Sequence, residues 1–268
     1  MSLKPDLIRD AAVQLSRAEQ SRVQIRQLSL QYPNITIKDA YAIQQTWVGM
    51  KIANGRTMRG HKIGLTSKAM QSALAIDEPD SGVLLDDMFF ENGTVVPSDR
   101  FIATRIEAEL AFVLKYRLKG PDCSLFDVLN ATDFVVPALE ILDTRIERVD
   151  AETGSTRKIV DTIADNAANA GVVLGGRPFR PVETDLRWVG ALVHKNGQIE
   201  ETGIAAGVLN HPATGVAWLA NKVAAQGHSL EVGQVILSGS FIRPIEARRG
   251  DTIHADFGAF GSVTCHFG

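Results

Sequence analysis

The spacing of apolar residues changes near residue 58, and this change limits the possible folds more than any other feature of the sequence. Before it, apolar side chains recur at helical spacing, first from Leu7 to Leu15 and then from Ala40 to Ile52. After it, short apolar runs are separated by turn signals such as Lys195-Asn196-Gly197, which predicts a hairpin. Because strands and helices do not alternate regularly there, the pattern favours an α+β fold over a doubly wound sheet. We predict a helical N-terminal portion, residues 1–57, packed on a β-rich body, residues 58–268, as one compact unit.

Local signals indicate where several of these elements begin and end. Thr36 precedes Asp39 by three residues, as in a helix capping box, and Asn54-Gly55 is typical of a helix end. His211-Pro212 predicts the start of a later helix, because proline is favoured at the first helical position. The strands predicted toward the C-terminus are Gly171–Leu174, Gln234–Phe241, Thr252–Phe257 and Ser262–Phe267.

Composition narrows the class of protein and of partner. Of the 268 residues, 22% are charged and the net charge is -3, so the basic excess of a protein that binds nucleic acid or an anionic membrane is absent. No apolar stretch is long enough to span a membrane, and the two cysteines form neither a disulfide framework nor a zinc spacing. We expect a cytoplasmic protein with no nucleic-acid or membrane partner. An anionic small substrate would need a metal ion or a few well-placed cations.

The stretch from Arg105 to Phe112 alternates between polar and apolar residues. Arg105, Glu107 and Glu109 fall on one face of a predicted strand, with apolar side chains on the other. Residues i and i+2 of a strand lie about 6.6 Å apart and point the same way. The two carboxylates can therefore converge on one cation, although such a pattern also fits an ordinary solvated strand face.

A third acid, Glu140, is the one charged residue in the apolar run Phe134–Leu142. A lone ionised carboxylate in a buried strand costs several kcal/mol unless it is paired or bound to metal. Either Glu140 joins Glu107 and Glu109 as hard oxygen ligands for Mg²⁺ or Mn²⁺, or it pairs with Arg105 or Arg145.

Several other polar residues are candidates for a site. His61 and Lys62 lie between glycines that allow close backbone approach, and Lys62 fits either an acid–base or anion-binding role or a surface position. Asp80, in the predicted loop Glu78–Gly82, either orients Lys62 or a water molecule or simply forms a turn. Ser240, after a predicted strand, is placed to bind a carboxylate or to complete a tight turn.

Other motifs point away from familiar chemistries. The sequence has no Gly-x-Ser-x-Gly elbow, no P-loop, no Gly-x-Gly-x-x-Gly fingerprint and no histidine-rich zinc motif. These absences weigh against serine hydrolases, nucleotide hydrolases and nicotinamide dehydrogenases. Asp165, Asn166 and Asn169 precede a predicted strand and are expected to be caps.

With these residues in place, the chain resembles the hydratase/decarboxylase branch of the fumarylacetoacetate-hydrolase-like superfamily. The resemblance extends from the first predicted helix nearly to Gly268, and its co-linear segments are more specific together than any one motif. The strongest segments are residues 60–67, 84–89, 105–109, 137–140, 165–171 and 206–212.

The resemblance implies a site, a fold and an assembly. It implies a β-roll or barrel-like body and a cytoplasmic homo-oligomer of pentameric or decameric type. It assigns Mg²⁺ or a similar ion to Glu107, Glu109 and Glu140, and it makes Lys62 the active-site lysine and Asp80 its neighbouring acid. Substrate-binding roles follow for His61 and Ser240.

The resemblance also implies an activity, namely metal-dependent addition of water to a small 2-oxo or 2-hydroxy unsaturated dicarboxylate in aromatic-ring degradation. Its alternatives are a 4-oxalocrotonate decarboxylase, a 2-hydroxypentadienoate hydratase and a carbon–carbon bond hydrolase, although the last lacks a clear histidine–acid pair here. A non-enzymatic alternative is the partner subunit of a hydratase–decarboxylase complex.

Overall fold

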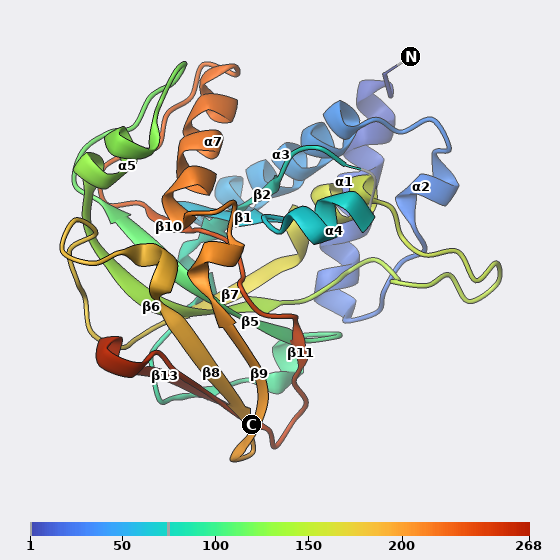
Figure 1. Cartoon of the computed structure of the whole chain (residues 1–268). Helices are drawn as coiled ribbons and strands as arrows, with labels where there is room; N and C mark the ends of the chain where they lie inside the picture. Colours follow the sequence, from blue (N-terminus) through green and yellow to red (C-terminus); the bar gives the residue numbers. More distant parts are fainter. Residues whose placement is uncertain (1, 74–75) are drawn as a thin grey trace.

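The structure is a computed structural model that describes residues 2–73 and 76–268. Helices gather on one side of a strongly curved sheet, and a second, smaller sheet lies on the other side (Figure 1). This arrangement confirms the predicted α+β fold. The α-helices are α1 Pro5–Ser21, α2 Leu28–Gln31, α3 Ile37–Ala53, α4 Lys68–Ala73, α5 Leu125–Ala131, α6 Ile159–Ala164 and α7 Pro212–Ala224.

Thirteen strands make up the two sheets in the described part of the chain. The larger sheet has the order β2-β1-β10-β5-β6-β7-β3, with β11 also pairing to β5, and the smaller has the order β4-β13-β12-β8-β9. The strands are β1 Met58–Gly64, β2 Asp80–Leu85, β3 Phe89–Phe90, β4 Val95–Val96, β5 Arg105–Leu114, β6 Thr132–Leu142, β7 Asn169–Leu174, β8 Gly190–Lys195, β9 Gln198–Ile204, β10 Val235–Leu237, β11 Ile245–Glu246, β12 Thr252–Asp256 and β13 Ser262–Phe267.

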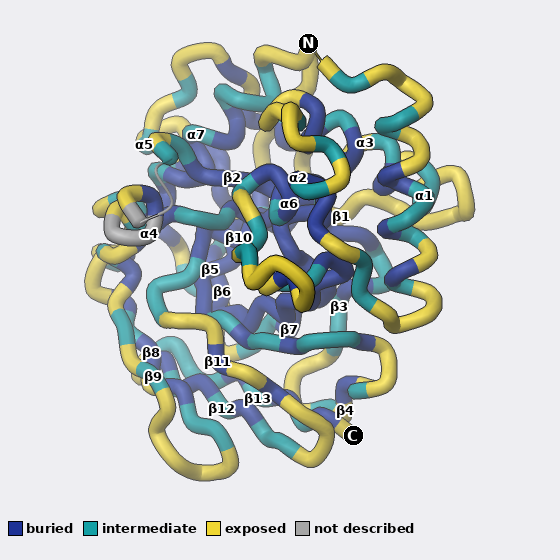
Figure 2. The backbone as a smooth tube through the Cα atoms, turned by 90° about the vertical axis from the view of Figure 1, so that its right-hand side faces the viewer, coloured by how far each residue is buried: buried dark blue, intermediate teal, exposed yellow. Residues whose placement is uncertain are grey.

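The larger sheet curls until strands near its two ends meet. Asn166, just before β7, bonds through its side chain to both backbone groups of Val83 on β2, at 2.8 and 2.9 Å. This amide takes the place of a strand neighbour and satisfies backbone groups that a curved edge would otherwise leave unpaired. The result is a half-barrel whose buried segments surround the centre of the molecule (Figure 2).

The N-terminal helices pack against the segment between β6 and β7 through one hydrophobic cluster. Trp47 and Ile43 of α3 and Leu15 of α1 are buried together with Ile146 and Ile163, which come from the segment between β6 and β7. The cluster therefore crosses residue 57, the predicted boundary of the helical portion. No helix in residues 2–73 and 76–268 has the length and apolar character needed to cross a membrane.

The turn between β8 and β9 in the smaller sheet is the hairpin turn that the sequence predicted. Asn196 and Gly197 join β8 to β9 with φ of 54° and 81°, the pair of positive values that a two-residue hairpin turn requires. The predicted helix start at Pro212 is also confirmed, with His211 Nδ1 accepting the N–H of Ala213.

The predicted strand Gln234–Phe241 is wrong in its second half, since β10 covers only Val235–Leu237. Gly239 has φ of 111°, which turns the backbone away from the sheet, and its N–H bonds to Glu109 Oε2 at 2.8 Å. The loop Glu78–Gly82 is also partly wrong, because strand β2 begins at Asp80.

The capping box at α3 generates a prediction about stability. Burial raises the pKa of Asp39, but hydrogen bonds from Ser2, Thr36 and Leu3 outweigh it and lower the pKa from 3.8 to about 2. We expect Asp39→Ala to lower the free energy of unfolding by about 1–2 kcal/mol at pH 7.

Because the pKa of Asp39 is lowered in the folded state, its contribution is complete above about pH 4 and disappears as the pH falls toward 2. Urea unfolding of both proteins at pH 7 and pH 3 measures this, with exposed Lys38→Ala as the control. A difference between wild type and Asp39→Ala that grows on acidification would contradict it.

Candidate active site

The pairing of β5 with β6 brings three acidic side chains to one face of the curved sheet. Glu107 lies directly opposite Glu140, while Glu109 lies opposite Ala138 and is thus a diagonal neighbour of Glu140. One carboxylate oxygen from each of the three glutamates lies within 4.8 Å of the other two. The three acids therefore form one cluster, as the alternation of residues 105–112 predicted.

Glu109 and Glu140 are completely buried, and each has a hydrogen-bond partner for only one of its two carboxylate oxygens. Glu140 Oε1 accepts from Asn169 Nδ2 at 2.7 Å, and Glu109 Oε2 accepts from the Gly239 N–H. Glu140 Oε2 and Glu109 Oε1 have no hydrogen-bond partner among the residues that the structure describes. A buried carboxylate oxygen without a partner is costly, so both oxygens are available to a cation.

The negative charges of these three acids repel one another. Burial, followed by the negative charge of Glu140, raises the pKa of Glu107 to about 8, and the same two causes raise the pKa of Glu109. A divalent cation among the three acids would offset both the burial and the repulsion that disfavour their charged forms. Three hard oxygen ligands in one place fit Mg²⁺ or Mn²⁺.

Lys62 on β1 and Asp80 on the adjacent strand β2 approach the same cluster. Lys62 is 3% exposed, and its Nζ lies 3.4 Å from Glu140 Oε1 and donates to the Ala167 carbonyl at 3.1 Å. Asp80 is 2% exposed and pairs in register with Gly64, where a Cβ would collide with the Asp80 carboxylate. The alternatives of a surface lysine and a simple turn aspartate are therefore wrong.

Burial and neighbouring charge shift the pKa values of Lys62 and Asp80 in opposite directions. Burial lowers the pKa of Lys62, but the carboxylates of Glu140, Asp80 and Glu107 outweigh it, so the net change is upward. Burial raises the pKa of Asp80, and the positive charge of Lys62 offsets only part of that increase. Lys62 is thus a buried ammonium group held among acids.

A left-handed turn before β7 supports this arrangement. Asn166, Ala167 and Ala168 have φ of 53°, 51° and 59°, a conformation that non-glycine residues adopt at a cost, especially in succession. The turn presents the Ala167 carbonyl to Lys62, and it places Asn169 against Glu140. Asp165 and Asn169 occupy the cap positions of this turn, as expected, whereas Asn166 lies inside it and bonds through its side chain to Val83.

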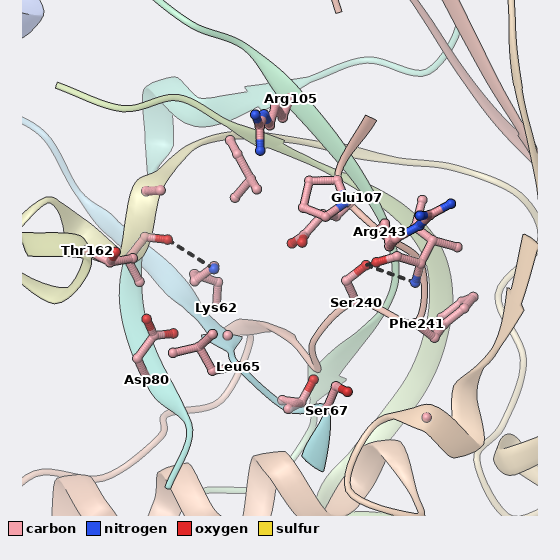
Figure 3. Close-up of a pocket in the computed structure, with 18 of the residues that line it drawn as sticks. Lys62, Leu65, Ser67, Asp80, Arg105, Glu107, Thr162, Ser240, Phe241 and Arg243 are labelled. Atoms are coloured by element: carbon pink, nitrogen blue, oxygen red, sulfur yellow. Dashed lines mark hydrogen bonds between the residues drawn. The ribbon is translucent and has the colours of Figure 1, made fainter. Parts of the chain in front are cut away.

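A cavity of about 640 Å³ opens onto this site. Lys62, Asp80 and Glu107 line it, and Ser240 and Phe241 from the loop after β10 face them across it (Figure 3). The Ser240 hydroxyl donates to the Ile242 carbonyl at 2.9 Å. Ser240 therefore contacts the cavity while it also holds its own loop.

Three sequence candidates, Glu109, Glu140 and His61, are absent from the cavity lining, and of these His61 alone lies outside the acid cluster. It neighbours Lys62 on β1 and so points to the opposite face of the sheet, and it is absent from the cavity lining. Burial lowers its pKa to about 4. The predicted substrate contact of His61 therefore lacks support from this geometry, and a neutral packing residue fits its position.

Sequence reasoning missed several groups whose position depends on strand register. Asn169 reaches Glu140 only because β6 and β7 pair with a shift between Ile141 and Leu142. Arg145 was a suggested partner of Glu140, but its Nε lies 2.5 Å from Asp165 Oδ1 instead. No local sequence signal distinguishes these pairings.

Comparisons with known proteins identify the family. No protein-family model matches the chain. Over 256 residues, 96% of either chain, it is 64% identical to the 2-oxo-hept-4-ene-1,7-dioate hydratase of Escherichia coli. The chain belongs to this hydratase family.

Solved structures agree with that membership. The family fold matches a 4-oxalocrotonate decarboxylase from Pseudomonas putida G7, complexed with magnesium and adipate, with a TM-score of 0.93 and 34% identity over 99% of this chain and 98% of the other. A fumarylacetoacetate hydrolase family protein from Yersinia pestis CO92 shares the fold at a TM-score of 0.55 and 14% identity, over 79% of this chain and 93% of the other. The resemblance and the β-roll fold predicted from the sequence are thereby confirmed.

The crowding of buried acids leads to a prediction about the metal-free protein. Replacing Glu109 by Gln keeps the acceptor for the Gly239 N–H but removes one of the mutually repelling charges. We expect Glu109→Gln to raise the melting temperature without metal at pH 7, because the charged form is disfavoured there, and to lose the further rise that Mg²⁺ gives the wild type.

Differential scanning fluorimetry with Mg²⁺ and with EDTA measures both effects, and exposed Glu200→Gln is the matched control. An equal Mg²⁺-induced rise in wild type and Glu109→Gln would exclude Glu109 as a ligand.

Proposed function

We propose that the chain adds water to 2-oxo-hept-4-ene-1,7-dioate, in equilibrium with 2-hydroxyhepta-2,4-diene-1,7-dioate, and forms 4-hydroxy-2-oxoheptane-1,7-dioate in homoprotocatechuate degradation. One observation carries this proposal: Glu107, Glu109 and Glu140 form a cluster beside Lys62, and Glu107, Lys62 and Asp80 line one cavity. The 64% identity to the Escherichia coli hydratase supports this reaction over its neighbours in the family.

Glu107, Glu109 and Glu140 would hold Mg²⁺ or Mn²⁺ through the oxygens that lack other partners. When bound, the cation supplies Lewis-acid charge for the C1 carboxylate and C2 oxygen of a 2-oxo acid. Asn169 and the Gly239 N–H fix the remaining oxygens of Glu140 and Glu109, which keeps both carboxylates in position.

Lys62 would act on the C2 oxygen. Its Nζ has one acceptor in the Ala167 carbonyl and one in Glu140, and a third N–H remains for the substrate. Water can add at C4 once the substrate has shifted to its 2-oxo-3-ene tautomer, in which the C3–C4 double bond is conjugated with the C2 carbonyl. A hydrogen bond from this ammonium group would stabilise the negative charge that then develops on the C2 oxygen. Lys62 can also deliver the proton that C3 receives.

Asp80 would position the water or relay protons. One of its carboxylate oxygens is buried and has no hydrogen-bond partner in the described residues, and burial favours its protonated form. Ser240, on the other side of the cavity, would contact the substrate chain.

The nearest alternative is decarboxylation of 4-oxalocrotonate, because the same acids and lysine would hold that 2-oxo acid. Hydration of 2-hydroxypentadienoate is a second alternative, and a non-catalytic partner subunit is a third. Intact acids and a buried Lys62 at one cavity favour an enzyme over a partner subunit.

We further propose that the protein is cytoplasmic and assembles as a pentamer or decamer of identical chains, as the family resemblance implies. Sedimentation equilibrium measures the mass of the assembly directly. A monomer at micromolar concentration would exclude this part of the proposal.

The activity is tested by following the conjugated chromophore of 2-hydroxyhepta-2,4-diene-1,7-dioate with Mg²⁺ and with EDTA, while mass spectrometry identifies the product. We expect a Mg²⁺-dependent gain of one water. No turnover of this diacid, together with carbon dioxide release from 4-oxalocrotonate, would assign the site to the decarboxylase.

Lys62→Met gives a separate prediction about the chemical step. We expect kcat to fall by roughly 10²- to 10⁴-fold, because the variant loses the proton donor and hydrogen bond at the C2 oxygen. Exposed Lys115→Met is the control for loss of a lysine charge. A kcat within error of wild type would remove Lys62 from the mechanism.

A further inference from the structure

Three arginines gather at one side of the active-site cavity. Arg105, on β5, and Arg157, in the segment before α6, both line it. Arg148 lies near both, because its carbonyl accepts the Arg157 N–H at 2.9 Å and its guanidinium group donates to the carbonyl of Ala103, two residues before Arg105. Burial, and then repulsion from Arg105 and Arg157, lower its pKa to about 10. The three guanidinium groups thus form a positive cluster, called here the arginine cluster.

Acids lie around the arginine cluster, with Glu246 paired to Arg105 across β11 and β5 and with Asp80, Asp161 and Asp165 near Arg157, but none forms an ion pair with it in the described part of the chain. No carboxylate oxygen lies within 4.0 Å of Arg105, Arg148 or Arg157 there. Arg148 donates to the Ala103 carbonyl at 3.1 Å, and Arg157 donates to Thr144 Oγ1 at 2.7 Å. These neutral acceptors orient the guanidinium groups without neutralising them.

The acids nearby are already engaged. Asp165 is bound by Arg145, and Asp143 accepts the backbone N–H groups of Ile102 and Ala103. By contrast, Arg243, on the same cavity, is paired with Glu201 at 2.6 Å. Partly buried cations that lack a partner are costly, and an anionic ligand would remove that cost.

The position of Arg105 relative to the acids indicates which part of a substrate would carry such an anionic group. Arg105 and Glu107 are two residues apart on one strand and share a face, so their Cα atoms are about 6.6 Å apart. A substrate whose C1 and C2 oxygens lie at the acids and Lys62 would bring a group several carbons away to Arg105. In a seven-carbon diacid that group is the second carboxylate.

We propose that Arg105 and Arg157 bind the second carboxylate of a dicarboxylate substrate, with Arg148 behind them, and that they select diacids over monoacids. This assignment rests on the proposed function for the placement of the reacting end. Guanidinium groups suit the task because they bind carboxylates through two parallel hydrogen bonds and stay charged when partly buried.

The wall that carries Arg157 is attached to the N-terminal part of the chain. Arg26 Nε lies 2.7 Å from Asp150 Oδ2, and Gln27 Nε2 donates to the Ser155 carbonyl at 2.7 Å. The Glu147 N–H donates to the Ile25 carbonyl at 2.9 Å, and the Ile25 N–H donates to the Arg145 carbonyl at 2.8 Å. These contacts fix the loop that holds Arg157 over the cavity, so the subsite is built before substrate arrives.

The test compares Arg157→Gln and Arg105→Gln with wild type on two substrates, the seven-carbon diacid and 2-hydroxypenta-2,4-dienoate, which lacks the second carboxylate. We expect KM for the diacid to rise about 10- to 100-fold in each variant, as for loss of a charged hydrogen bond. The monoacid lacks the group that these arginines would bind, so we expect the ratio of kcat/KM for the diacid to kcat/KM for the monoacid to fall about 10- to 100-fold. The melting temperature of each variant shows separately that it is folded. Arg157→Lys should recover part of the loss.

A binding experiment without turnover separates this inference from the proposed function. Calorimetry with Mg²⁺ present compares adipate, a saturated diacid, with hexanoate, a monoacid of equal length. We expect wild type to prefer adipate and Arg157→Gln to lose that preference. Arg243→Gln, whose charge is already neutralised by Glu201, should keep it.

The outcomes are distinct. Wild type that binds adipate no better than hexanoate, or variants that affect both ligands equally, would overturn the arginine subsite even if hydration is confirmed. A diacid preference that depends on Arg157 in a protein that does not hydrate the diacid would support the subsite and refute the proposed reaction.

Discussion

The register between β5 and β6 is the constraint on which the site depends. It sets Glu107 opposite Glu140 and makes Glu109 a diagonal neighbour, so three acids occupy one small region of a buried sheet. A slip of one residue would turn one of these strands over and place its acids among the apolar side chains of the opposite face. Ile106, Ala108 and Leu110 on that face are completely buried, and they hold the register against such a slip.

Concentrating negative charge in this way requires support from neighbouring segments. Lys62 supplies a positive charge from β1, and hydrogen-bond donors come from Asn169 at the start of β7 and from Gly239 in the loop after β10. The left-handed turn at residues 166–168 serves two of these purposes, since it receives Lys62 and positions Asn169. Its unfavourable φ values are consistent with the general observation that backbone strain is concentrated at functional sites.

Local sequence patterns predicted much of this molecule because they act over short distances. The helix caps at Thr36 and Pro212, the hairpin at Asn196-Gly197 and the shared face of Glu107 and Glu109 each depend on a few adjacent residues. Contacts such as Arg145 with Asp165 depend on how distant segments come together, and no short pattern encodes them. The predicted substrate contact of His61 gains no support for a related reason, since a residue next to Lys62 on a strand faces the other way.

The attachment of residues 147–158 to the N-terminal segment divides the pocket between two parts of the chain. The three acids and Lys62 lie on strands of the curved sheet, whereas the wall with Arg157 is held by residues that precede the first strand. Changes around Arg26 or Gln27 can therefore move that wall while the acids stay in place. Such an architecture separates two kinds of substitution, those at the N-terminal contacts that alter the wall of the pocket and those on β5 or β6 that alter the acids.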